Sequence, residues 1–124
     1  MKQRVLCIAG ILSIILLCVA AAYATSSAPS APGGLSVTIA GDGGFILKWK
    51  ASADDPGTVT GYEIVRASIA SGPFKKIGKT KRGVLQYHDK TAKPEIIYFY
   101  KVRAIAGKKF SDYSQPAAAE RPGN

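Results

Sequence analysis

The chain has 124 residues, 47% of them hydrophobic, and its 17 basic residues outnumber its 8 acidic ones to give a formal net charge of +9. This length suits one folded domain and leaves no room for a second, because a single core usually occupies roughly 100 to 200 residues. One histidine and two cysteines restrict the metal sites and catalytic triads that the chain could form.

The N-terminus has the layout of a secretory signal peptide over residues 1–24. Lys2 and Arg4 precede an apolar run, residues 5–22, which ends in the small-residue sequence AYA. This order predicts cleavage after Ala24 and a mature chain that is secreted, periplasmic or held in the cell envelope. The alternative is an uncleaved membrane anchor, because about 18 apolar residues just suffice to span a bilayer.

Both cysteines, Cys7 and Cys18, lie inside this segment, so we expect a mature chain without a disulfide. Packing alone must then stabilise the domain, without the roughly 2 to 4 kcal/mol that a disulfide contributes. The segment also holds two of the 17 basic residues and none of the 8 acidic ones, which leaves the mature chain at +7. Such a charge suits anionic partners, and it is also a common way to stay soluble.

The next residues, 25–32, read TSSAPSAP and have the small, polar, proline-bearing composition of a flexible linker. We expect the folded domain over residues 33–120, followed by a short tail, residues 121–124. Within the domain no window keeps a helical period over three turns. Short apolar runs separated by Gly, Pro, Asp and Lys predict an all-β fold instead.

Seven runs alternate apolar and polar residues with the period of two that is typical of strands. In chain order they cover residues 35–39, 45–50, 62–67, 74–80, 85–89, 98–106 and 113–119. The lysines of the fourth run suit an edge strand, because charges discourage pairing with another chain. Seven short strands separated by turns predict two packed antiparallel sheets.

Three of these runs resemble the core signature of fibronectin type III domains. They contain Trp49, the sequence GYEIVR over residues 61–66, and the sequence YFYKVRA over residues 98–104. The resemblance covers residues 32–119 and implies a seven-stranded, antiparallel, immunoglobulin-like β-sandwich. The side chains that it places in the structural core are Trp49, Tyr62, Ile64, Tyr98, Tyr100 and Val102.

The resemblance also places Tyr98 at the family's tyrosine corner, where the hydroxyl bonds to the backbone upstream. The loop before it departs from the family pattern, because Glu95 stands where glycine is common and Ala92 where a larger aliphatic residue is common. Further along, the sequence SDYS over residues 111–114 is similar to a segment of bacterial members of the family.

We predict no enzyme, no metal site and no cofactor. The only histidine, His88, lies in a predicted strand, where we expect it to face solvent rather than act as a base. Asp42, Asp54 and Asp55 lie in turn sequences, and they suit turn formation better than calcium binding, which needs six to eight oxygen ligands.

Basic residues are the remaining candidates for a functional surface. In the family's arrangement the third, fourth, sixth and seventh strands share one sheet, so the resemblance implies that basic side chains converge on one face. The candidate anion-binding residues are Lys75, Lys76, Lys101, Arg103, Lys108 and Lys109. Exposed ion pairs contribute only about 0.2 to 1 kcal/mol each, so such a face would act on a polymer where contacts accumulate. Phe99 and Phe110 would stack beside the charges or cover the sheet.

The fold resemblance and the lack of a catalytic constellation predict a noncatalytic, exported, monomeric module for binding or adhesion to a protein or a cell surface. Two alternatives stay open: an accessory polysaccharide-binding domain that uses the basic face, and a structural spacer or assembly subunit of the envelope. The expected partner is a protein or an anionic polysaccharide, with no specific nucleic acid. We expect contact with a membrane only through the signal segment, and only if that segment stays uncleaved. The alternative for the basic face itself is a solvated surface that only keeps the chain soluble.

Overall fold

The computed structural model describes residues 28–123, so the predicted signal peptide and residues 25–27 of the predicted linker lie outside the described part. Every regular element in this part is a β-strand. The strands are β1 (Gly33–Ile39), β2 (Phe45–Lys50), β3 (Gly61–Ala67), β4 (Lys75–Lys81), β5 (Gln86–Asp89), β6 (Ile97–Ala106), β7 (Lys109–Phe110) and β8 (Ala117–Glu120). Among the described residues, no helix is long and apolar enough to cross a membrane.

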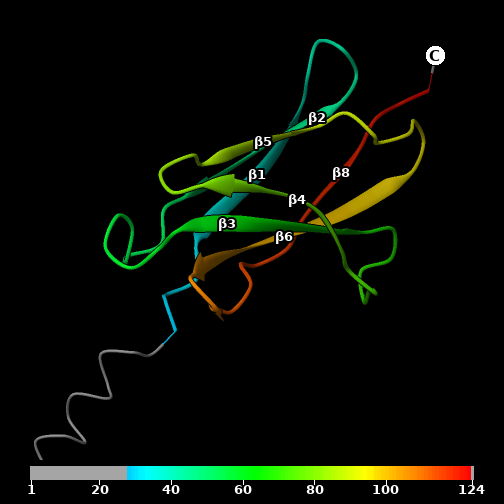
Figure 1. The fold of residues 1–124 in the computed structure, drawn as a ribbon. Helices are drawn as coiled ribbons and strands as arrows, with labels where there is room; N and C mark the ends of the chain where they lie inside the picture. The colour runs from blue at the N-terminus through cyan, green and yellow to red at the C-terminus, as the bar shows by residue number, and fades with distance from the viewer. Residues whose placement is uncertain (1–27, 124) are drawn as a thin grey trace, which may run out of the picture.

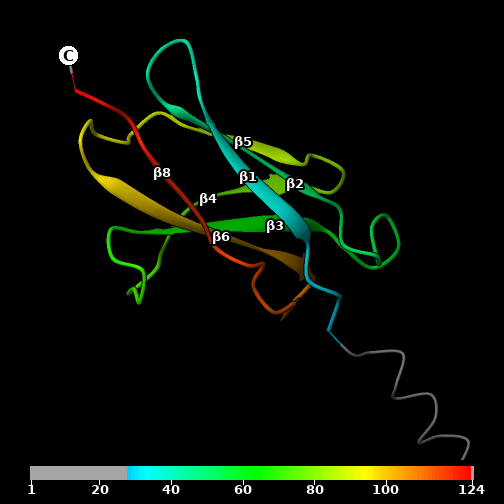
Figure 2. The same ribbon diagram turned by 180° about the vertical axis from the view of Figure 1, so that it is seen from behind.

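The strands form two packed antiparallel sheets (Figures 1 and 2). One sheet has the order β1-β2-β5; the larger has the order β4-β3-β6-β7, and β8 also pairs with β6. This arrangement confirms the predicted all-β sandwich, and β4 lies at an edge of its sheet, as its lysines predict. The described chain enters at one end of the sandwich and leaves at the opposite end (Figure 1).

The predicted last strand, residues 113–119, begins only at Ala117 in the structure, as β8, and the additional short strand β7 (Lys109–Phe110) precedes it. Between β7 and β8, two serine hydroxyls accept hydrogen bonds from backbone N–H groups of β6. Ser111 Oγ accepts from Ala104 N at 2.7 Å, and Ser114 Oγ accepts from Val102 N at 3.1 Å. Ser111 and Ser114 are three positions apart in the chain, whereas their partners on β6, Ala104 and Val102, are two positions apart. The segment between β7 and β8 therefore contains one extra residue relative to β6, as a β-bulge does. The bulge interrupts the regular pairing with β6.

Aromatic side chains fill the space between the sheets. All six side chains expected in the core, Trp49, Tyr62, Ile64, Tyr98, Tyr100 and Val102, are buried. Trp49 meets Tyr62 with ring centroids 5.7 Å apart, and Phe45 meets Tyr100 edge-on at 6.1 Å. Such pairs contribute about 0.5 to 1.5 kcal/mol beyond the burial of their surface. The core therefore joins the two sheets through rings from both.

The packed chain begins before β1, inside the stretch with linker composition. Pro29 and Pro32 are buried. Ser30 N donates to Asp54 Oδ2 at 2.8 Å, and Ser30 Oγ accepts from Ala53 N at 2.8 Å. These residues are held because the turn after β2 offers them partners, which composition alone does not reveal.

The loop between β5 and β6 forms the tyrosine corner with an unusual residue. Tyr98 Oη accepts a hydrogen bond from Lys93 N at 3.1 Å. Glu95, which occupies the position where glycine is common, has φ of 66°, in the left-handed region that favours glycine. Its N–H donates to the carbonyl of Arg121 at 2.7 Å, and Arg121 Nη2 donates to Ala92 O at 3.1 Å. The C-terminal segment beyond β8 thus helps to hold this loop.

Candidate binding surface

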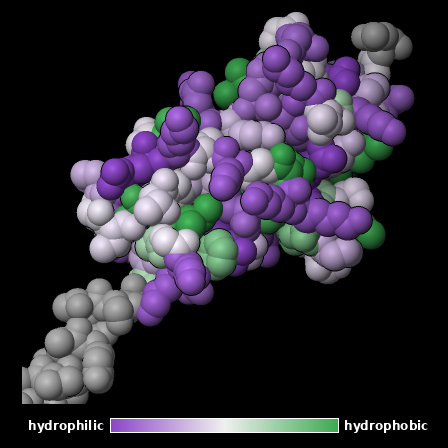
Figure 3. Space-filling view, viewed as in Figure 1, coloured by the Kyte–Doolittle hydropathy of each residue, from purple (hydrophilic) through white to green (hydrophobic). Residues whose placement is uncertain are grey.

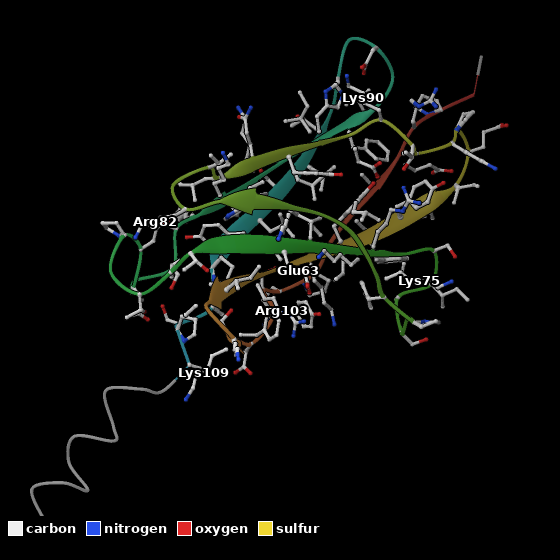
Figure 4. All side chains as sticks on the ribbon, in the orientation of Figure 1. Glu63, Lys75, Arg82, Lys90, Arg103 and Lys109 are labelled. Carbon is white, nitrogen blue, oxygen red and sulfur yellow. The ribbon has the colours of Figure 1, made fainter. Side chains whose placement is uncertain are left out.

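The outer face of the larger sheet carries charged residues that the strand register aligns. Glu63 on β3 lies opposite Arg103 on β6, and Val65 lies opposite Lys101. Directly opposed residues point to the same side of a sheet, and their neighbours point into the core. Glu63 and Arg103 accordingly lie close together in Figure 4. The register places Lys101, opposite Val65, on the same face.

Rings and cations alternate across this face. Arg103 Cζ lies 3.8 Å from the ring centroid of Phe110 and 4.8 Å from that of Tyr113. Lys101 Nζ lies 4.4 Å from the centroid of Phe74 and 5.9 Å from that of Tyr113. Each such contact contributes about 0.5 to 1 kcal/mol at an exposed site. We call these five residues, together with Glu63, the cation–aromatic face.

Glu63 fixes the middle of the cation–aromatic face. Its Oε1 accepts from Arg103 Nε at 2.8 Å and from Tyr113 Oη at 3.4 Å. Glu63 is only 8% exposed although it points away from the core, because side chains of the face cover it. A carboxylate buried in this way needs a paired cation, and the pair largely cancels the charge of Arg103. Burial raises the pKa of the Tyr113 hydroxyl, which therefore remains a donor at neutral pH.

The structure brings together only part of the candidate anion-binding set. Lys76 lies opposite Val65, which itself lies opposite Lys101, so Lys76 joins Lys101 and Arg103 on the outer face. Lys75 lies opposite Arg66, whose side chain turns to the inner side and bonds Asp89. Lys75 therefore points away from the cation–aromatic face.

The last two residues of that set lie at the far end of the sheet. Lys108 is in the turn between β6 and β7, and Lys109 pairs with Ala106 at the end of β6. Figure 4 shows Lys75 and Lys109 at opposite ends of the molecule. One ligand that contacts all six basic residues would have to span the whole sheet.

Sequence reasoning found only part of the aromatic set. Phe110 does contact Arg103, but Phe99, paired with Ala67 and Ala118, makes no cation contact within the described residues. The sequence pattern placed Phe74 and Tyr113 at the starts of predicted strands, whereas in the structure both lie outside the strands and reach the face from a turn and from the bulge. Only their contacts with Lys101 and Arg103 reveal that they converge.

The acidic turn residues and His88 make local contacts. Asp42 Oδ1 accepts from Gly44 N at 2.9 Å and lies 3.2 Å from His88 Nε2; the Gly44 bond is the main reason why the pKa of Asp42 is lowered. Asp55 Oδ2 accepts from Tyr62 Oη at 2.8 Å. Across the described residues, no three side chains of His, Cys, Asp or Glu gather in a way that could hold a metal ion.

The cation–aromatic face presents ring surface to solvent. Phe110 is 41% exposed and Tyr113 is 37% exposed, and their contacts with Arg103 hold both rings in place. On the side of the molecule that Figure 3 shows, most of the surface is hydrophilic and apolar side chains form small, separate patches. Rigid, half-exposed rings beside a paired charge suit binding to a flat, partly apolar surface.

Two packed antiparallel sheets with this strand order define an immunoglobulin-like β-sandwich. Within that class, a family model described as "Fibronectin type III domain" matches residues 30–120. The chain therefore belongs to the fibronectin type III family, as the sequence signature predicted.

The relatives include enzymes and domains of larger proteins. An amylopullulanase from Thermoanaerobacter thermohydrosulfuricus is 41% identical over 59 residues, which are 48% of this chain and 4% of that protein. A solved Fn3-like protein from Clostridium thermocellum has a TM-score of 0.66 and 25% identity, with 79% of this chain and 98% of that chain covered. The twitchin kinase region from C. elegans has a TM-score of 0.68 at 23% identity, with 79% and 17% covered, and it shares the fold.

Proposed function

We propose that this chain is an exported, noncatalytic module that binds a polysaccharide on its cation–aromatic face. The observation that carries the proposal is the pair of half-exposed rings, Phe110 and Tyr113, which both contact the Arg103 guanidinium. Rings that are already fixed lose little conformational freedom when a flat sugar ring stacks on them. The signal-like composition of residues 1–24 supports export.

The amylopullulanase relative supports a polysaccharide over a protein as the partner. Its match is 41% identical but covers only 4% of that protein, so it concerns a module of the enzyme and not the enzyme as a whole. A protein or cell-surface partner, and a purely structural spacer, are the competing functions for the same fold. They differ from the proposal in requiring no affinity for a free glycan.

The paired charge of Arg103 shapes the expected specificity. Because Glu63 neutralises Arg103 at 2.8 Å, ring stacking rather than surplus positive charge should dominate the affinity. Stacking is little affected by salt, whereas contacts between exposed charges are screened over about 8 Å at physiological ionic strength. We therefore expect a neutral glucan to bind at least as well at physiological salt as a polyuronate.

The test is affinity electrophoresis of a chain that starts at Thr25, run through native gels with and without soluble pullulan, starch or polygalacturonate. We expect retardation by a neutral glucan, and its loss in the double variant Phe110→Ala/Tyr113→Ala. The variant Lys48→Ala, on the outer face of the other sheet, is the matched control and should be retarded like the wild type.

A far-ultraviolet circular dichroism melt of each variant separates loss of binding from loss of fold. Absence of retardation by every glycan, or retardation that survives in the folded double variant, would overturn the proposal. The protein-partner and spacer functions would then take its place.

A further inference from the structure

A separate groove opens at the end of the sandwich where the turn between β3 and β4 meets the loop between β5 and β6. It has a volume of about 490 Å³, which lies within the range of small-molecule sites. Its lining includes three cations, Arg66, Lys75 and Lys93, and three aliphatic side chains, Ile69, Ile77 and Ile96. None of these residues belongs to the cation–aromatic face.

Arg66 is held in a fixed position at this groove. Its Nη1 donates to Asp89 Oδ2 at 2.9 Å and to Thr91 Oγ1 at 2.8 Å, and its guanidinium lies 4.5 Å above the ring of Tyr98. Within residues 28–123, its Nε and Nη2 donors make no further hydrogen bond. These donors are therefore available to a ligand, on a side chain that needs no reordering to bind.

The groove carries more positive charge than its surroundings neutralise. The ammonium groups of Lys75 and Lys93 form no hydrogen bond or ion pair with any described residue. No Asp or Glu is among the residues that line the groove, and Asp89, which pairs with Arg66, is only 2% exposed, with both of its oxygens already accepting hydrogen bonds. Charge complementarity thus favours an anionic occupant.

The aliphatic lining of the groove favours an anion that carries an aliphatic chain. Ile69 is 61% exposed and Ile96 is 37% exposed, which leaves branched aliphatic surface open to solvent. The one ring that lines the groove, that of Tyr98, is 6% exposed and covered by Arg66, so it offers no face for stacking a sugar. The groove differs in this respect from the cation–aromatic face.

We propose that this groove binds a small alkyl carboxylate, with the carboxylate between Arg66, Lys75 and Lys93 and the alkyl chain against Ile69 and Ile96. No covalent step is involved. The site is independent of polysaccharide binding, since it shares no residue with that surface.

The probe is hexanoate, titrated at low salt and neutral pH into the ¹⁵N-labelled chain that starts at Thr25, with amide shifts followed by NMR. We expect saturable shifts confined to residues 66–77 and 91–98. Hexanol and galacturonate, which lack the charge and the alkyl chain respectively, should bind more weakly than hexanoate.

The double variant Lys75→Met/Lys93→Met should lower the affinity for hexanoate by roughly twofold to thirtyfold, because two exposed ion pairs of about 0.2 to 1 kcal/mol each are lost. Lys76→Met is the matched control: it changes the neighbouring lysine on the outer face and should leave the affinity unchanged. Both lysines of the double variant are exposed, so its fold should persist, and its unperturbed amide spectrum would show this.

Three results would overturn the inference. They are shifts scattered over the surface without saturation, equal losses in the control and the double variant, and binding of galacturonate as tight as that of hexanoate. A negative result in this titration would not change the result expected from affinity electrophoresis with glycans, so the two proposals are tested separately.

Discussion

At the scale of the residue, Asp89 has the densest set of polar contacts in the described chain. It accepts from Tyr100 Oη at 2.6 Å, from Arg66 Nη1 at 2.9 Å and from Thr91 at 2.9 Å through N and 2.7 Å through Oγ1. Burial favours the neutral acid, but these hydrogen bonds outweigh it and hold the pKa of Asp89 below its ordinary value. The sequence placed Asp89 at the end of a strand and gave no sign of these partners.

The pH dependence of stability follows from the direction of that shift. A carboxyl whose pKa is lower in the folded state stabilises the fold above its unfolded pKa, and the contribution is lost as the pH falls through the folded value. We expect Asp89→Asn to lower the free energy of unfolding by about 3 kcal/mol at pH 7, since it removes the partner of Arg66. At pH 2 the loss should be smaller, because the wild-type carboxyl also gains protons as the pH falls towards its lowered pKa.

Urea denaturation at the two pH values measures this difference. Asp42→Asn is the control, because Asp42 is an exposed carboxylate that also accepts a hydrogen bond and has a lowered pKa. Its substitution should have a much smaller effect at pH 7. A loss for Asp89→Asn that is equal at pH 7 and pH 2 would contradict the assignment of an ionised, stabilising Asp89.

At the scale of the element, alternation predicted β2 well and β3 only in part. On β2, Phe45, Leu47 and Trp49 are buried while Lys48 and Lys50 are exposed, as a strand with one face to solvent requires. On β3, Glu63 and Val65 are buried as well. This strand lies between β4 and β6, and the side chains of the cation–aromatic face cover its outer side.

The bulge before β8 provides a prediction at the same scale. Ser111→Ala leaves the buried N–H of Ala104 without its acceptor, which should lower the free energy of unfolding by about 1 to 3 kcal/mol. Chemical denaturation measures the loss, and amide hydrogen exchange should show faster exchange at Ala104. Ser36→Ala, at an exposed position of β1, is the control and should change neither quantity. Unchanged exchange at Ala104 in the Ser111 variant would contradict the role of that hydroxyl.

At the scale of the whole molecule, the domain depends on its aromatic core. The described residues contain no cysteine, so no disulfide supports them. Trp49 comes from the three-stranded sheet and meets Tyr62 of the larger sheet at 5.7 Å, which links the two layers. Loss of this contact therefore affects the sandwich as a unit.

Trp49→Ala should lower the free energy of unfolding by about 3 to 5 kcal/mol, against a usual total of about 5 to 15 kcal/mol. We expect a largely unfolded or marginally folded domain at 37 °C, measured by thermal melting with circular dichroism. Trp49→Phe keeps a ring beside Tyr62 and should retain most of the stability. A melting temperature of Trp49→Ala equal to that of the wild type would contradict the central place of this residue.

The sequence by itself determined the all-β class, the family, the aromatic core and an edge position for β4. Each depends on local patterns: period-two alternation, turn residues, and a signature such as GYEIVR over residues 61–66. Only the tertiary structure decided that Lys76 and not Lys75 shares the face of Lys101 and Arg103, that Phe74 and Tyr113 reach that face, and that residues 29–32 belong to the packed domain. These facts depend on the register between strands and on contacts between residues distant in the chain, which local alternation does not specify.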